Sequence, residues 1–367
     1  MLKLLFILSF SLSSLSAVAY DAGPRLAKLP KWFKNRAPEQ ELEIDLCLED
    51  SWSEQVPDAS KLGPYEVETK FLSLDSKLTG RSITAKLFEA KKSGCQDSSV
   101  EDAPLVVFLA PGFIGSIPWP LDLGKSKLYD MQVYEGYMHH LASYGIKTLG
   151  LYEARGSIFS KLEDVDHKRD AMEISSFITD LIERKSELSI SFDEEKLAIM
   201  GHSKGAKLAF YSATMDERIK VILAVDPVNS GGPPCFISKS CTKFPVAPNP
   251  KNGDKGILDQ VVAKTLIFNA PIDKLWNPDP QFHARHFYNG LESDTFLAEV
   301  NAGHASWMFN EKVKSLTRAL FVSYLFKNLK DDSGFDSYLD GDGLEHHKAS
   351  GLLGRLGDKS EIGDLEK

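Results

Sequence analysis

The spacing of apolar residues changes along this chain in a way that outlines a central domain. Residues 70–75 (KFLSLD) and 83–90 (ITAKLFEA) alternate apolar and polar side chains. This alternation predicts antiparallel strands with one face covered and the other facing water. Residues 104–110 (PLVVFLA) are apolar without such alternation, which predicts a strand buried on both faces of a parallel sheet.

Beyond residue 110, strand-length apolar runs alternate with segments of helical spacing. Strands are predicted at residues 146–152, 196–200, 220–225, 264–268 and 295–300. Helices are predicted over residues 131–143, 169–184, 204–214, 279–289 and 311–326. The helical spacing is visible in the stripe Ala171, Ile174, Ile178 and Leu181, which predicts one helix face packed on a sheet. The order predicts an α/β fold with a mostly parallel central sheet and helices on both faces.

The segments around this pattern divide the chain further. Residues 1–19 have Lys3 before an apolar run and end in Ala-Val-Ala, which indicates a cleaved secretory signal. The alternative is a membrane anchor, but the run Leu4 to Leu12 is shorter than the roughly 20 residues that a spanning helix needs. We therefore expect a secreted protein or one in the secretory pathway. Residues 20–63 are interpreted as an extension lying over a domain at residues 64–330, and residues 331–367 as a flexible acidic tail.

Composition narrows the class of partner. The chain has 367 residues, a hydrophobic content of 43% and a net charge of -9, which fits one large soluble domain and makes nucleic acid an unfavourable ligand. The four cysteines are Cys47, Cys95, Cys235 and Cys241. An even number behind a secretory signal favours disulfides, and Cys235 with Cys241 closes the shortest loop; four buried thiols are the alternative.

The strongest chemical motif is Gly201-His202-Ser203-Lys204-Gly205, which fits G-x-S-x-G between a predicted strand and a predicted helix. In that context the motif predicts a nucleophile elbow, a tight turn that presents the serine hydroxyl above the sheet. Ser203 is therefore the candidate nucleophile. An accidental surface turn is the alternative, because the bare motif arises by chance.

A serine hydroxyl needs a base, and the base in turn needs an acid that orients it. His304 follows the predicted strand 295–300 and comes after the serine, in the chain order expected of an α/β-hydrolase fold. Two aspartates follow strands on the same edge of the sheet, Asp226 and Asp273. The spacing does not decide between them.

The oxyanion formed during acyl transfer needs two backbone N–H donors. One is expected from Lys204, directly after the serine, and the other from Phe113 in the loop after strand 104–110, because Pro111 has no N–H. His283 and His286 have a spacing that could pair them on a metal, but no third ligand is indicated. We expect no metal and no cofactor.

Three segments of the chain resemble the chlorophyllase family of α/β-hydrolases, over roughly residues 105–307. Residues 140–145 (HLASYG) resemble a family helix end, residues 201–206 (GHSKGA) are similar to G-H-S-R-G-G, and residues 225–228 repeat V-D-P-V. The likeness to platelet-activating-factor acetylhydrolases and to dienelactone and polyester hydrolases is more distant. The resemblance implies ester hydrolysis, and it implies Asp226 as the acid, with Asp273 in reserve.

The departures from the family pattern concern the substrate rather than the three candidate residues. Pro111 stands where a histidine is usual, Lys204 where an arginine is, and Ala206 where a glycine is. The expected partner is a hydrophobic ester, with a lipid interface as a possibility that the long loop 227–259 favours. The alternatives are a phospholipid or polyester esterase, and a binding protein without catalysis on the same scaffold. A chlorophyllase-like enzyme could also reach a plastid through the secretory route.

Overall fold

The computed structural model describes residues 58–91, 103–109, 129–152, 167–229, 246–247, 256–271, 284–292 and 294–363. All of these residues belong to Leu46–Lys367, the second of the two units into which the chain divides. The predicted signal at residues 1–19 and the four cysteines lie outside the described residues. Among the helices of the described segments, none is long and apolar enough to cross a membrane.

One mixed sheet organises the described residues, with the strand order β1-β2-β4-β3-β5-β6-β7-β8-β9. The strands are β1 (Val67–Asp75), β2 (Ser82–Ala90), β3 (Leu105–Leu109), β4 (Lys147–Tyr152), β5 (Leu197–His202), β6 (Ile219–Val225), β7 (Lys264–Asn269), β8 (Thr295–Val300) and β9 (Leu353–Asp358). Strands β4, β3, β5, β6, β7 and β8 pair in parallel, whereas β1, β2 and β9 run antiparallel to their neighbours. This sheet confirms the predicted α/β-hydrolase class of fold.

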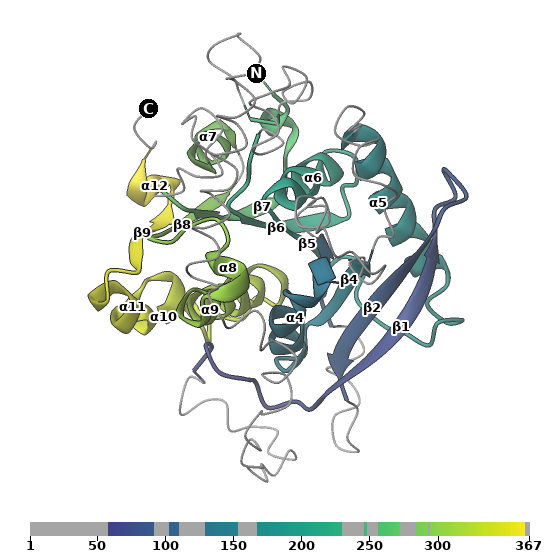
Figure 1. Ribbon diagram of the computed structural model, residues 1–367, viewed down its shortest axis with the longest axis horizontal. Helices are drawn as coiled ribbons and strands as arrows, with labels where there is room; N and C mark the ends of the chain where they lie inside the picture. The colour runs from purple at the N-terminus through teal and green to yellow at the C-terminus, as the bar shows by residue number, and fades with distance from the viewer. Residues whose placement is uncertain are drawn as a thin grey trace, which may run out of the picture. The chain divides into compact units, whose positions relative to one another are not determined.

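Helices cover both faces of the sheet (Figure 1). The helices are α3 (Tyr129–Gln132), α4 (Glu135–Ala142), α5 (His167–Glu183), α6 (Lys204–Ala213), η8 (Leu258–Gln260), α7 (Ala284–Gly290), α8 (Ser306–Phe309), α9 (Glu311–Leu329), α10 (Asp336–Leu339), η10 (Asp342–Leu344), α11 (Glu345–Ala349) and α12 (Lys359–Ile362). Helices α4, α8 and α9 pack on one face, and α5, α6 and α7 pack on the other, each with its own buried cluster. The predicted stripe on α5 is buried, with Ala171 and Leu181 fully inaccessible.

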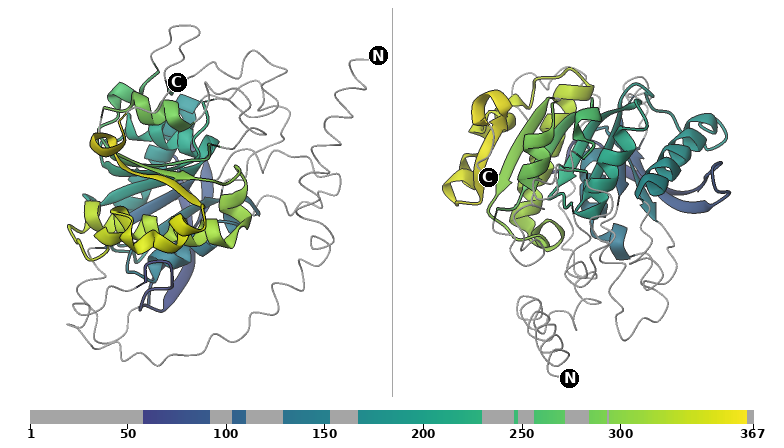
Figure 2. Two further views of the ribbon diagram at one scale, coloured as in Figure 1. Left: turned by 90° about the vertical axis from the view of Figure 1, so that its left-hand side faces the viewer. Right: turned by 90° about the horizontal axis from the view of Figure 1, so that it is seen from above.

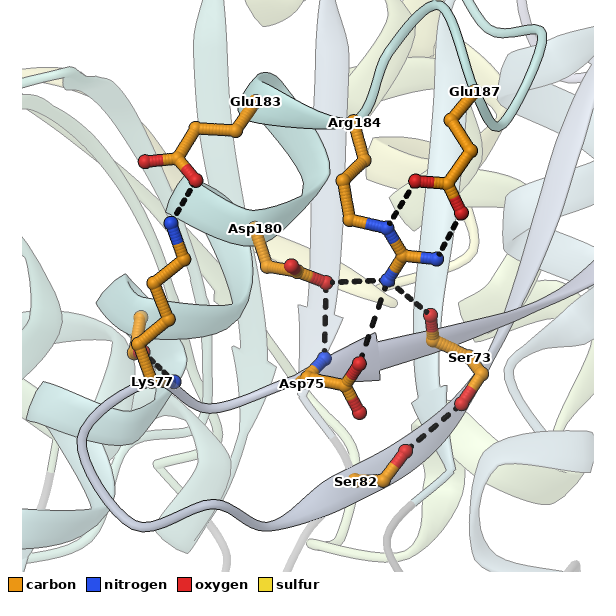
Figure 3. A network of polar contacts seen from close by, with 9 residues as sticks. Ser73, Asp75, Lys77, Ser82, Asp180, Glu183, Arg184 and Glu187 are labelled. Atoms are coloured by element: carbon orange, nitrogen blue, oxygen red, sulfur yellow. Dashed lines mark hydrogen bonds and ion pairs between the residues drawn. The ribbon is translucent and has the colours of Figure 1, made fainter.

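Arg184, directly after α5, is one of several residues that join the antiparallel hairpin β1–β2 to α5 (Figure 3). Arg184 donates to both carboxylate oxygens of Glu187, to Asp180 at 3.0 Å and to the carbonyl oxygen of Ser73 at 3.2 Å. Asp180 also accepts the backbone N–H of Asp75, so the same carboxylate contacts the helix and the hairpin. A planar guanidinium with several donors suits this shared arrangement.

The prediction of a flexible tail at residues 331–367 is wrong for most of its length. Residues 331–363 form α10, η10, α11, β9 and α12, and β9 adds an antiparallel strand to β8. Figure 2 shows β9 at the end of the sheet beside β8. The charged composition of this segment does not predict a strand, because an edge strand gains its hydrogen bonds from the backbone and needs few apolar side chains. Leu353 supplies one buried contact, with an exposed fraction of 5%.

Candidate active site

Ser203 lies at the junction of β5 and α6, in a backbone conformation that residues other than glycine rarely adopt. Its φ is 57° and its ψ is -120°. Such conformations cost on the order of 1–3 kcal/mol and persist only where neighbouring contacts impose them. Here the N–H of Ser203 donates to the carbonyl oxygen of Val225 at 2.9 Å, and the carbonyl oxygen of Ser203 accepts from the N–H of Lys207 at 3.2 Å. The predicted elbow therefore has the strained turn that its motif implies.

Gly201 makes this turn possible because a side chain has no room there. A Cβ atom at residue 201 would lie 2.2 Å from the backbone carbon and oxygen of Gly205. These are backbone atoms, so a rotamer change cannot relieve the overlap. The close approach joins the end of β5 to the first turn of α6 and fixes the direction in which Ser203 leaves the sheet.

Asp226 and His304 are brought together by two strand ends. Nδ1 of His304 and Oδ2 of Asp226 lie 2.6 Å apart, and both residues are buried, with exposed fractions of 8% and 2%. Asp226 follows β6 with a φ of 42°, and its N–H donates to the carbonyl oxygen of Phe268 at 2.9 Å. The other candidate acid, Asp273, lies outside the described residues. Of the two aspartates, Asp226 is the one that contacts His304 in the described structure.

Ser203 and His304 reach the same edge of the sheet. Strands β5 and β6 pair in parallel with His202 opposite Val225, so Ser203 and Asp226 leave adjacent strands side by side. The ring of His304 packs on the ring of His202, the residue directly before Ser203, with 4.6 Å between the ring centroids. The candidate nucleophile, base and acid therefore come from three strand ends at one edge.

Of the two predicted oxyanion donors, Lys204 and Phe113, the structure describes Lys204. Lys204 is the first residue of α6, at the end of the helix where the helix dipole favours negative charge. Phe113 lies outside the described residues. The position of Lys204 suits the role that the sequence predicts for its N–H.

Lys207, one turn further along α6, is a buried lysine beside the elbow, and no pattern in the sequence predicts its burial. Its side chain has an exposed fraction of 1%, and Nζ donates to the carbonyl oxygen of Asn229 at 3.0 Å. The side chain of Asn229 in turn accepts the N–H of Val246 and donates to the carbonyl oxygen of Ala247. Burial lowers the pKa of Lys207 from 10.5 to about 7, and the charge of Lys204 adds to this fall.

Tyr134, just before α4, also lies near the site without any motif that marks it. It is buried with an exposed fraction of 1%, and its hydroxyl is joined to Nδ1 of His202 by a hydrogen bond of 2.5 Å. The two residues are far apart in the sequence, so only the packing of α4 against the sheet reveals the contact.

Two further features were compared with the site: clusters of metal-binding side chains and a surface hollow. The described segments contain no cluster of three or more histidine, cysteine, aspartate or glutamate side chains that could hold a metal ion, and His283 lies outside them. A surface hollow of about 510 Å³ is lined by residues of α9, α10, η10 and α11 and by Asp58 and Ser60. None of Ser203, Asp226 and His304 lines that hollow, so it is separate from the candidate active site.

Residues 82–239 match the chlorophyllase family, and this segment runs from β2 past β6. The fold is that of an α/β-hydrolase, and over the matched residues, fewer than half of the chain, the sequence is similar to the chlorophyllase family. The match to chlorophyllase indicates a hydrolase of the ester-cleaving type, and it includes Ser203 and Asp226. His304 lies beyond the matched segment, so its place in the site rests on its contacts with Asp226 and His202. No curated protein matches the chain.

Proposed function

We propose that this chlorophyllase-like protein hydrolyses a carboxylic ester through an acyl-enzyme, with Ser203 as nucleophile, His304 as base and Asp226 as the acid that orients the base. The observation that carries the proposal is the buried 2.6 Å contact between His304 and Asp226, beside a serine held at a φ of 57°. The three residue types in this arrangement match the requirements of acyl transfer.

In the first step, Oγ of Ser203 attacks the ester carbonyl carbon while Nε2 of His304 takes the hydroxyl proton. The carboxylate of Asp226 accepts a hydrogen bond from Nδ1–H, which leaves Nε2 free of a proton and therefore basic. As negative charge develops on the carbonyl oxygen, this oxygen accepts hydrogen bonds from the backbone N–H of Lys204 and, as second donor, that of Phe113. When the intermediate collapses, His304 returns its proton to the departing alcohol oxygen.

In the second step, water attacks the acyl group on Ser203. His304 takes a proton from the water, and the Ser203 oxygen leaves with the proton that His304 then returns. The products are the carboxylic acid and the free enzyme. The proposed chemistry uses only side chains and backbone N–H groups and needs no cofactor.

The substrate is proposed to be a hydrophobic ester, in line with the family match. Chlorophyll is one member of that class to test. A panel that also contains a short-chain ester, a phospholipid and a polyester separates the chlorophyllase-like assignment from the other esterase assignments. Selective cleavage of the phospholipid would favour the alternative, a phospholipid esterase of the same fold.

The first test is covalent labelling by a fluorophosphonate probe, which reacts rapidly only with an activated serine. We expect rapid labelling of the wild type and none of Ser203→Ala. Ser189→Ala is a matched control, because Ser189 also has a positive φ, of 51°, but lies in the turn after α5. Labelling that is absent from the wild type, or that persists in Ser203→Ala, contradicts the proposed nucleophile and favours a binding protein without catalysis.

A further inference from the structure

His202 lies between the nucleophile elbow and the proposed base. It immediately precedes Ser203, its ring is fully buried, and the planes of the His202 and His304 rings are inclined by 37° at a centroid distance of 4.6 Å. In the described structure, Asp226 contacts Nδ1 of the His304 ring and His202 packs against one side of it.

The hydrogen bond to Asp226 does not by itself fix the imidazole ring of His304. The contact of Asp226 with Nδ1 sets the direction of one ring atom, but the ring can still turn about that contact and carry Nε2 away from Ser203. Proton transfer requires heavy atoms within hydrogen-bond reach, so the tilt of the ring matters for the rate. The His202 ring, packed against one side of the His304 ring at an inclination of 37°, restricts this turning.

Tyr134 holds the His202 ring in place. The hydrogen bond between the Tyr134 hydroxyl and Nδ1 of His202 is 2.5 Å long, and both side chains are buried. Tyr134 is itself stacked on Tyr137, with ring centroids 6.2 Å apart. The hydroxyl of Tyr137 donates to the carbonyl oxygen of Trp307 at 2.7 Å, three residues after His304. The α4 segment thus contacts the residue before the nucleophile and the helix after the base.

The charge state of His202 suits a residue beside a base. Burial lowers the pKa of His202 well below its ordinary value, and the proximity of His304 lowers this pKa further. His202 is therefore neutral near pH 7. A neutral ring does not repel the imidazolium that His304 becomes when it takes the proton of Ser203, whereas a second cation would.

We propose that Tyr134 and His202 are positioning residues for His304: Tyr134 fixes the His202 ring, and that ring holds His304 in the orientation from which it serves Ser203. This inference rests on the proposed function for its kinetic consequence. Its structural part, the orientation of the His304 ring, is measurable without any activity.

The kinetic test uses Tyr134→Phe, which removes one hydroxyl and keeps the packed ring. We expect the maximal rate of fluorophosphonate labelling to fall roughly tenfold, with little change in the probe concentration at half-maximal rate. Tyr144→Phe is the matched control, because Tyr144 is equally buried and its hydroxyl donates to the carbonyl oxygens of Asp58 and Lys61, away from the site. Equal rates for the two variants overturn the inference.

A double-mutant cycle tests whether Tyr134 acts through His202. His202→Phe keeps a flat ring against His304 but cannot bond with the Tyr134 hydroxyl. If the effect passes through His202, then Tyr134→Phe changes the rate less than about twofold in the His202→Phe background. A tenfold loss in that background shows that Tyr134 acts by another route and overturns the inference.

Proton NMR separates this inference from the proposed function. The Nδ1–H of His304 should give a low-field resonance because it donates to a buried carboxylate, and Asp226→Asn assigns the signal by removing it. We expect Tyr134→Phe to shift or broaden the resonance and Tyr144→Phe to leave it unchanged. If the resonance shifts but Ser203 is not labelled by the probe, the positioning role of Tyr134 and His202 is supported and the proposed hydrolase activity is contradicted. If Ser203 is labelled but the resonance does not change, the proposed hydrolase activity is supported and the positioning role is contradicted.

Discussion

Asp226 and His304 are separated by 78 residues in the sequence, and their buried side chains meet at 2.6 Å at one edge of the sheet. The contact has a clear consequence for variants. Asp226→Asn preserves the shape of the side chain but removes the negative charge. An amide can also donate to Nδ1, which favours the tautomer with its proton on Nε2, where the base needs a lone pair.

We therefore expect Asp226→Asn to reduce the rate of ester cleavage by roughly 10³–10⁴-fold while the protein stays folded. The measurement is single-turnover hydrolysis of an activated ester, with circular dichroism to verify folding. Asp332→Asn is the control, because Asp332 is exposed in the turn after α9. A loss of less than tenfold in Asp226→Asn would transfer the role of the acid to Asp273.

The elbow geometry predicts a second variant effect. In Gly201→Ala, the new Cβ would lie 2.2 Å from the backbone of Gly205, so β5 and α6 would have to separate. We expect a destabilisation of about 1–3 kcal/mol or more, together with loss of labelling at Ser203. Chemical denaturation measures the first effect and the fluorophosphonate probe the second.

Gly136→Ala is the matched control for this variant. Gly136 lies in α4, and a Cβ there meets nothing within 4 Å. Since alanine favours helix, this control should be more stable by roughly 0.5–1 kcal/mol and should be labelled at the wild-type rate. If Gly201→Ala behaves like Gly136→Ala, the close approach at the elbow does not exist in solution.

The buried Lys207 predicts how stability depends on pH. Its pKa is about 7 in the folded protein and 10.5 as its ordinary value, so between these two values the unfolded chain binds more protons than the folded chain. The free energy of unfolding contributed by this residue therefore rises as the pH increases from about 7 to 10.5, and it is constant below about 7.

Lys207→Met removes this titration and keeps an unbranched side chain in the same space. We expect the variant to be more stable than the wild type at pH 7, with the difference shrinking as the pH approaches 10. Urea denaturation at a series of pH values checks this. A difference between the two proteins that stays constant over that range would show that Lys207 is charged in the folded state at every pH tested.

The sequence predicts the parallel core and the elbow because both depend on local signals. An uninterrupted apolar run such as 105–109 suits a strand covered on both faces, and G-x-S-x-G has meaning where a strand meets a helix. The choice between Asp226 and Asp273 is not local. It depends on which of the two loops brings its aspartate to His304 in the folded protein. The spacing of the strands in the sequence does not show this.

Two other features were missed for related physical reasons. Tyr134 contacts His202 only because α4 packs across the sheet, and a lone buried tyrosine has no pattern that distinguishes it from ordinary core. The sequence of β9, LGRLGD, is rich in glycine and charge and therefore predicts a flexible tail rather than a strand. Its pairing with β8 relies on backbone hydrogen bonds, which composition does not report.

The C-terminal strand also predicts a truncation effect that reaches the active site. Asn301, three residues before His304, donates its backbone N–H to the carbonyl oxygen of Leu352 and its side-chain amide to that of Gly351, both at 2.8 Å. A chain that ends at Ser350 loses both acceptors, the β9 ladder and the buried side chain of Leu353. The loop that carries His304 would then be held at one end only.

We expect this truncation to lower the thermal midpoint and to slow labelling at Ser203, whereas a chain that ends at Gly363 should match the full-length protein, because it keeps every contact described for β9 and α12. Hydrogen exchange provides the local measurement: the Asn301 amide should be protected in the full-length chain and exchange faster in the chain that ends at Ser350. Equal midpoints, labelling rates and exchange for the two truncated chains would mean that residues 351–363 do not support the His304 loop.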